Sequence, residues 1–255
     1  MQQPFLPADF TLASSTALVG PYGSGKSEIA LTLACLMARR LQARPDNRLQ
    51  VALGDIDVLK PYFRAREAGE ALKAMGVRLL APSGPLKSAD LPILTPELGC
   101  AAREADTLLV LDVGGDPAGA RALGSLRDEV DTNALDLLLV LNRHRPFMES
   151  VESVVEQADK IQRASGLRLT GVVSNTHMMA ETTLDDVALG LELARRVGGA
   201  LDVPVRLIGL GRAIATLIER DDLAPTLLQG IPAIVLDSAL KPAFLGGCAL
   251  SPGDP

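Results

Sequence analysis

Eight residues near the start of the chain have the types and the spacing of a phosphate-binding loop. Gly20–Ser27 reads GPYGSGKS and matches the pattern GxxxxGK[ST] in full. Glycines in such a loop let backbone N–H groups approach phosphate oxygens, and the helix that follows adds the positive end of its dipole. We therefore expect Lys26 to reach the β- and γ-phosphates of a nucleotide and the Ser27 hydroxyl to bind Mg²⁺. The residues predicted to bind nucleotide in this loop are Gly20, Tyr22, Gly23, Ser24, Gly25, Lys26 and Ser27.

Acidic residues come directly after two apolar runs that are typical of strands. Asp112 is expected to hold the hydration shell of Mg²⁺, and Gly115 lets the backbone approach a γ-phosphate. Asp55 and Asp57, spaced i and i+2, can supply one ligand to hydrated Mg²⁺ and one acceptor for an attacking water. The predicted metal-binding residues are Ser27, Asp55 and Asp112.

The segment after Asp57 carries aromatic and basic side chains. Tyr62 and Phe63 could close over a nucleotide or simply pack in the interior. Arg64 and its neighbour Arg66 could stabilise the charge of a transferring phosphoryl group, in cis or across a dimer. Two surface arginines at the start of a helix are an equally good interpretation. The predicted catalytic residues are Lys26, Asp57 and Arg64.

Two asparagines are candidates for contact with the base of a nucleotide. Asn175 ends the run GVVSN and Asn142 ends the run LVLN, and an amide offers both a donor and an acceptor. Asn175 is the first choice and Asn142 the second. Neither is followed by the NKxD pattern that selects guanine in many GTPases, so ATP is favoured over GTP. His144 and His177 lie beside these asparagines, and surface hydrogen bonding is their simplest interpretation.

Short apolar runs alternate along the chain with longer amphipathic stretches, which predicts an α/β domain with a mostly parallel sheet and helices on both faces. The expected strands are Thr16–Gly20, Gln50–Leu53, Val77–Ala81, Thr107–Leu111, Leu137–Leu141, Leu169–Ser174 and Val205–Ile208. The expected helices are Lys26–Gln42, Glu67–Met75, Pro96–Ala105, Met148–Ser165, Thr183–Val197 and Arg212–Glu219, with another after Asp116. We predict an N-terminal extension (1–13), one P-loop nucleotide-binding domain (14–240) and an irregular C-terminal tail (241–255).

The composition is that of a globular protein. Of 255 residues, 47% are hydrophobic and 22% are charged. A net charge of −6 and a pI near 5.0 argue against a chain-wide surface for nucleic acid. No apolar run of about 18 residues and no leader pattern occurs, and three widely spaced cysteines fit neither a disulfide framework nor a zinc site. We expect a cytoplasmic protein.

Taken together, the motifs resemble those of the MinD/ParA/CobQ-like group of P-loop ATPases. They are especially similar to a bacterial branch with the patterns DxD…PYFRxRE, DVGGD…GAxALG and NxH…ETT, present here at 55–67, 112–124 and 175–183. The resemblance spans about 14–237. It implies that Asp57 positions the attacking water, that Asp55 lies near the metal, and that Asn175 contacts adenine. Pro21 stands where many members carry a lysine that reaches the nucleotide of a dimer partner, which weakens the expectation of a nucleotide-dependent homodimer.

The favoured function is a Mg²⁺-dependent ATP-binding and ATP-hydrolysing switch that acts on a protein partner. An ATP-dependent small-molecule ligase or synthetase of the same fold is the alternative, and the proline-rich segment 82–96 could then build a substrate pocket. A GTPase is a further alternative. No nucleic-acid partner is expected, because the basic stretches are short. No stable membrane anchor is expected, because ALKPAFLGG near the C-terminus is short and broken by proline.

Overall fold

A single sheet of eight parallel strands organises the chain. The computed structural model describes residues 3–44, 46–56, 65–80, 96–115 and 117–236, and the sheet has the order β3-β2-β4-β1-β5-β6-β7-β8. Every described strand pair is parallel. The strands are β1 (Ser15–Val19), β2 (Gln50–Ile56), β3 (Val77–Leu80), β4 (Thr107–Val113), β5 (Leu135–Leu141), β6 (Gly171–Ser174), β7 (Val205–Gly211) and β8 (Ala233–Leu236).

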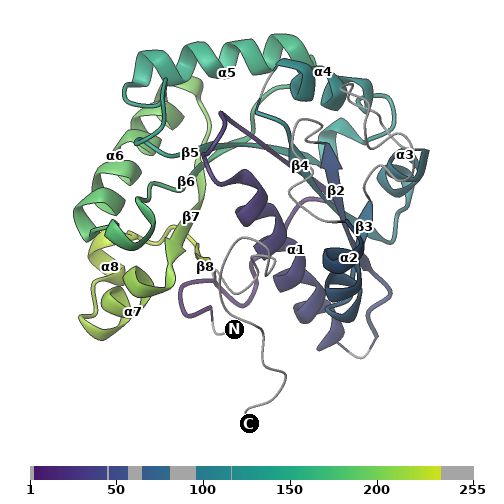
Figure 1. Ribbon diagram of the computed structural model, residues 1–255, viewed down its shortest axis with the longest axis horizontal. Coiled ribbons are helices and arrows are strands. Elements are labelled where there is room, and N and C mark those ends of the chain that lie inside the picture. The colour runs from purple at the N-terminus through teal and green to yellow at the C-terminus, as the bar shows by residue number, and fades with distance from the viewer. Residues whose placement is uncertain (1–2, 45, 57–64, 81–95, 116, 237–255) are drawn as a thin grey trace.

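Helices cover both faces of this sheet (Figure 1). They are α1 (Lys26–Gln42), α2 (Ala65–Ala74), α3 (Pro96–Arg103), α4 (Pro117–Ser125), α5 (Val151–Ser165), α6 (Leu184–Leu201), α7 (Arg212–Arg220) and the short α8 (Ala224–Leu227). One buried cluster joins the strands to α3, α4, α5 and α6, and a second joins the other face of the strands to α1 and α2. The predicted fold class, an α/β domain with a mostly parallel sheet and helices on both faces, is confirmed.

The central strands are apolar on both faces because both faces are covered by helices. All five residues of β1 are buried, and alternate residues point into different clusters: Ala17 and Val19 into one, Leu18 into the other. β1 lies between β4 and β5. The loop that follows β1 therefore lies between the loops that follow those two strands.

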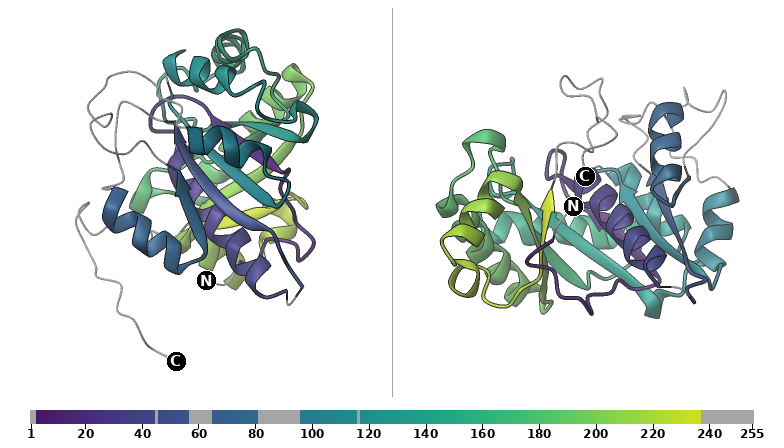
Figure 2. Two further views of the ribbon diagram at one scale, coloured as in Figure 1. Left: turned by 90° about the vertical axis from the view of Figure 1, so that its right-hand side faces the viewer. Right: turned by 90° about the horizontal axis from the view of Figure 1, so that it is seen from below.

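A third cluster closes the β8 end of the sheet, where α6, α7 and α8 pack on β7 and β8. Figure 2 shows this end and the α2–α3 end at opposite sides of the molecule. The N-terminal segment also packs here: the Ala233 backbone N–H donates to the Phe5 carbonyl oxygen at 3.1 Å, and the Gln3 side-chain amide bonds both backbone groups of Val235. Arg40 of α1 donates to the carbonyl oxygens of Pro7 and Phe10.

The elements differ from the predicted ones mainly at their ends and at the far edge of the sheet. β8 and α8 were not predicted. β2, β4 and β7 each run two or three residues beyond their predicted ends, so that Asp55 and Asp112 lie within strands. The expected helix range begins at Thr183, and this residue is the N-cap of α6, through a reciprocal capping box with Asp186.

Candidate functional site

The phosphate-loop sequence folds into a tight connection between β1 and α1. Gly20, Gly23 and Gly25 have φ angles of 141°, 77° and 92°, which side chains other than glycine's rarely adopt. A Cβ atom at Gly20 would also lie 2.6 Å from the Val140 carbonyl oxygen. The glycine spacing is therefore required by this backbone path, which leads directly into the N-terminus of α1.

Lys26, the first residue of α1, lies against the loop. It is 6% exposed, and its Nζ donates to the Pro21 carbonyl oxygen at 3.0 Å. Ser27 is half-buried at the next position, Ser24 is fully buried, and Tyr22 at the tip of the loop is 59% exposed. The lysine ammonium is thus held at the loop that the glycines shape.

The predicted acidic residues lie on the β4 side of the loop. Asp55 of β2 and Asp112 of β4 are paired in register, and Asp112 is in turn paired with Leu18 of β1. Asp112 is 4% exposed and Asp55 is half-buried. Asp112 therefore lies on the strand next to β1, near its carboxyl end, and Asp55 lies one strand further from the phosphate loop.

Gly115 brings the loop after β4 into contact with the phosphate loop. A Cβ atom there would lie 2.8 Å from the Tyr22 backbone nitrogen and 3.0 Å from the Gly20 carbonyl oxygen. The predicted nucleotide-sensing loop and the phosphate loop thus touch through their backbones. This close approach accounts for glycine at 115.

The residues present suit a Mg²⁺ ion that takes only some of its ligands from the protein. Within the described parts of the chain, no three His, Cys, Asp or Glu residues come together as a preformed metal site. Mg²⁺ is usually held by one or two carboxylates together with phosphate oxygens and waters. Asp55, Asp112 and the Ser27 hydroxyl fit that donor set.

Two further residues hold the phosphate loop from the β5 and β6 side. Asn175, 1% exposed and directly after β6, donates from Nδ2 to the Ser24 carbonyl oxygen at 2.8 Å. Arg145, in the loop after β5, donates from Nε to the Gly23 carbonyl oxygen at 2.9 Å. The two consecutive carbonyls are thus each fixed by a side chain from another part of the chain.

The Asn142 side chain makes its hydrogen bonds to groups of the protein itself. It is fully buried, its Nδ2 donates to the His177 carbonyl oxygen at 3.2 Å, and its Oδ1 accepts from the His144 backbone N–H at 3.1 Å. Both ends of its amide therefore join the loops after β5 and β6. Base contact by Asn142 or Asn175 stays a prediction, and the contacts seen here are with protein groups.

His144, in the loop after β5, contacts Asp186 of α6. His144 Nε2 lies 2.9 Å from Asp186 Oδ1. Hydrogen bonds from the Thr183 backbone and hydroxyl, with a smaller contribution from His144, hold the pKa of Asp186 below its ordinary value. Asp186, the partner of Thr183 in the capping box, thus also ties α6 to the loop after β5.

Two predicted catalytic residues, Asp57 and Arg64, lie outside the described residues. The same holds for Tyr62, Phe63 and the tail from residue 237, and for the proline-rich segment apart from Pro96. Arg145, by contrast, contacts the loop although the sequence did not single it out as a site residue. The only signal for it was its place just after a predicted strand.

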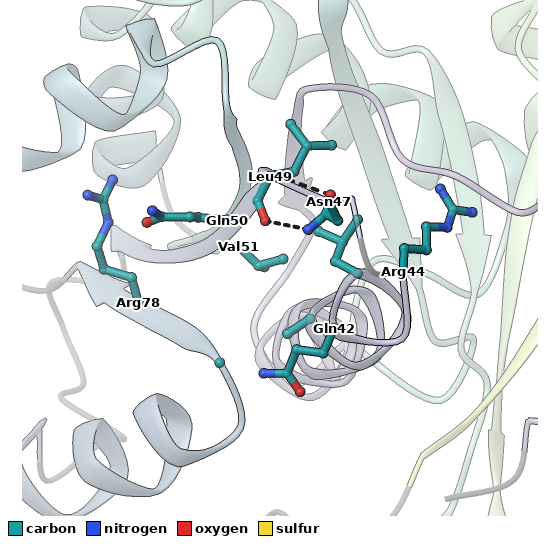
Figure 3. A pocket seen from close by; sticks show the side chains of 10 residues that line it. Gln42, Arg44, Asn47, Leu49, Gln50, Val51 and Arg78 are labelled. Carbon is teal, nitrogen blue, oxygen red and sulfur yellow. Dashed lines mark hydrogen bonds between the residues drawn. The ribbon is translucent and has the colours of Figure 1, made fainter.

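A separate pocket of about 440 Å³ lies at the amino ends of β2 and β3, away from the phosphate loop. It is lined by Ala38, Leu41, Gln42, Arg44, Asn47, Leu49, Gln50, Val51, Gly76 and Arg78. Figure 3 shows Arg44 and Arg78 on opposite sides of it, not directed toward one another. Arg78 is bonded to Glu104 and the Asn47 amide to Leu49, so these polar groups do not converge on a common point.

Comparison with known proteins identifies the fold. No protein-family model and no curated protein matches the sequence. The structure is similar to the signal recognition particle 54 kDa protein of Aeropyrum pernix K1, in complex with GDP, at a TM-score of 0.52 and 18% identity over 90% of this chain and 51% of that one. It is also similar to the signal recognition particle receptor FtsY of Elizabethkingia anophelis, in complex with GDP, at a TM-score of 0.45 and 18% identity over 82% and 62%. The chain thus spans about half to three fifths of these two proteins.

The similarity at these identities concerns the fold alone. The chain shares the fold of the 54 kDa protein, and membership of the MinD/ParA group of P-loop ATPases stays a prediction. In the described ranges, no helix has both the length and the apolar character needed to cross a membrane.

Proposed function

We propose that this chain is a Mg²⁺-dependent nucleoside triphosphatase with ATP as its nucleotide. The observation that carries the proposal is the arrangement around one loop: Lys26 lies against it, and Gly115 touches it. Asp112 lies on the strand next to β1, and Asp55 is paired with Asp112 one strand further away. These groups are separate in sequence. Their arrangement around a glycine-shaped loop suits a triphosphate with its metal.

In this proposal the groups have distinct tasks. The loop N–H groups and Lys26 bind the β- and γ-phosphates and stabilise the charge of the transferring phosphoryl group. Ser27, Asp55 and Asp112 hold Mg²⁺, which neutralises phosphate charge when it is bound. Asp57 orients the attacking water, and Arg64 adds positive charge at the γ-phosphate. The last two assignments rest on the sequence alone.

GTP is the second candidate nucleotide. It is favoured by the GDP in the structurally similar 54 kDa signal recognition particle protein. ATP is favoured by the missing NKxD pattern after Asn142 and Asn175. Competition of ATP and GTP for one labelled nucleotide decides between them.

The proposed role is a switch that acts on a protein partner. Exposed large hydrophobic side chains lie in the loops at this edge of the sheet: Tyr22 at the tip of the phosphate loop (59% exposed), Phe147 after β5 (64%), and Met178 and Met179 after β6 (44% and 59%). A partner that docks at this edge would cover them. Because Gly115 contacts the loop, a γ-phosphate that moves the 112–119 segment would change the same surface.

The test is nucleotide binding by calorimetry with Mg-ATP, Mg-ADP, Mg-GTP and Mg-GDP. Lys26→Ala should lose binding by at least about 100-fold, because it removes a buried phosphate-binding cation. Lys160→Ala is the matched control, since Lys160 lies on α5 and is 58% exposed. Equal affinity of Lys26→Ala and the wild type for every nucleotide would remove the site assignment.

Light scattering tests the switch. A dimer that appears only with a non-hydrolysable Mg-ATP analogue would support a nucleotide-dependent homodimer despite Pro21. An unchanged mass would move the proposal toward a different protein partner.

A further inference from the structure

We propose that Arg145 is a nucleotide-binding residue that contacts the phosphates shared by the di- and triphosphate forms. The inference rests on the proposed function and deepens it, because it assigns a second cation to the same site. The sequence motifs gave this residue no role.

The guanidinium of Arg145 lies directly against the phosphate loop. Nε donates to the Gly23 carbonyl oxygen at 2.9 Å, and a Cβ atom at Gly23 would lie 3.1 to 3.4 Å from Nε, Cδ and Cζ. The side chain is half-buried. Its two terminal nitrogens make no hydrogen bond or ion pair to the described residues, so they are available to a ligand beside the loop.

The backbone around Arg145 is fixed before any ligand binds. Its N–H donates to the Asn142 carbonyl oxygen at 2.9 Å, and the Asn142 amide is bonded to the loop after β6. The Arg143 backbone N–H donates to the Thr176 hydroxyl at 3.2 Å. An arginine held in this way loses little conformational freedom on binding a phosphate, which favours affinity.

Its place in the sheet indicates which phosphates it reaches. Gly115, Asp55 and Asp112 lie on the β4 side of β1, where the metal and the γ-phosphate are expected. Arg145 follows β5, on the other side of β1, and contacts the later part of the loop. It therefore faces the α- and β-phosphates, which nucleoside di- and triphosphates have in common.

The charges at the site also favour this assignment. Asp112 and, one strand further away, Asp55 place carboxyl groups on the β4 side of the loop, and Lys26 is a cation against the loop itself. Arg145 supplies a second cation from within the same chain, and its planar fork suits phosphate oxygens.

The experiment measures Kd for Mg-ADP and Mg-ATP, and for Mg-GDP and Mg-GTP, with three variants. Arg145→Ala removes the whole group, and Arg145→Gln keeps a hydrogen-bond donor without the charge. Arg143→Ala is the matched control, because its side chain makes none of these contacts. We expect Arg145→Ala and Arg145→Gln to raise Kd about 10- to 100-fold, equally for diphosphate and triphosphate, as for loss of one charge-assisted contact. Arg143→Ala should stay within about 2-fold of the wild type.

The other outcomes overturn the inference in distinguishable ways. Wild-type affinity for Arg145→Gln would show that the residue only holds the loop. A loss confined to the triphosphate would place the guanidinium at the γ-phosphate. Melting temperatures without nucleotide identify a variant whose affinity falls because it folds poorly. If only Arg145→Ala has a lowered melting temperature, the affinity of Arg145→Gln tests the inference. If the wild type binds none of the four nucleotides, the proposed function itself fails, and this inference with it.

Discussion

Replacing Asn175 with alanine should destabilise the protein even when no nucleotide is present. The side chain is 1% exposed, and its Nδ2 donates to the Ser24 carbonyl oxygen at 2.8 Å across a separation of 151 residues. Asn175→Ala removes that donor and leaves a buried carbonyl oxygen without it. The change therefore tests whether the asparagine holds the phosphate loop.

The size of the effect can be worked out from these contacts. A buried carbonyl group that loses its partner costs about 1–3 kcal/mol, and the small cavity adds roughly 1 kcal/mol. Asn175 Oδ1 is itself buried without a hydrogen-bond partner among the described residues, so its removal offsets part of the cost. The sum is about 2 kcal/mol, which lowers the melting temperature of a domain of this size by about 4–8 °C.

Calorimetric or fluorescence-detected unfolding without nucleotide measures this directly. Asn133→Ala is the control, because Asn133 is exposed on a short 3-10 turn before β5 and should shift the melting temperature by less than about 2 °C. If the melting temperature of Asn175→Ala falls by no more than that of Asn133→Ala, the hydrogen bond to Ser24 does not hold the loop, and the reasoning is refuted.

Three further results are expected. Gly115→Ala should weaken nucleotide binding by about 10-fold or more, since its Cβ would lie 2.8 Å from the Tyr22 backbone nitrogen and displace the phosphate loop; unchanged binding in a calorimetric titration would contradict that close approach. Asp57→Ala should bind ATP normally but fail to hydrolyse it, as phosphate release would show, and normal turnover would exclude Asp57 as the group that positions water. The hydrogen bonds from Thr183 lower the pKa of Asp186 below its ordinary value of 3.8, so the stability that its carboxylate contributes is present above that pH and is lost as the pH falls below it. Denaturant unfolding should therefore show a shallower acid-induced loss of stability for Asp186→Asn, and a slope equal to that of the wild type would argue against a role for this carboxylate.

The fold could be predicted from the sequence because its strongest signals are local. Buried parallel strands are continuous apolar runs, and the helices between them are amphipathic, so both appear within short windows. β8 escaped prediction although β3 and β6, which are equally short, were predicted; it is completed by Gln3 and Phe5 from the other end of the chain, which no local window contains. The start of α5 was placed too early because its cap, Ser150, is paired with Ser153 and not with the Glu or Gln of the usual capping box.

The candidate site was predictable where a motif demands particular residue types. The loop glycines, Lys26, Asp55 and Asp112 lie at the same edge of the sheet, near the carboxyl ends of its strands, and their binding of nucleotide and metal stays a prediction. Arg145 was missed because strand order is not contained in local sequence: only the pairing of β1 with β5 brings the loop after β5 to Gly23. The contacts of Asn142 and Asn175 with protein groups likewise depend on that order.

The position of β1 has a consequence for synthesis. This strand is made first and is buried on both faces and edges, yet its partners β4 and β5 end only at residues 113 and 141. At about 5–20 residues per second, the second partner leaves the ribosome on the order of ten seconds later. Throughout that interval an apolar strand with open backbone groups is exposed to other nascent chains. We therefore expect the rate of translation, and the chaperones present during it, to affect how much of this protein reaches the folded state.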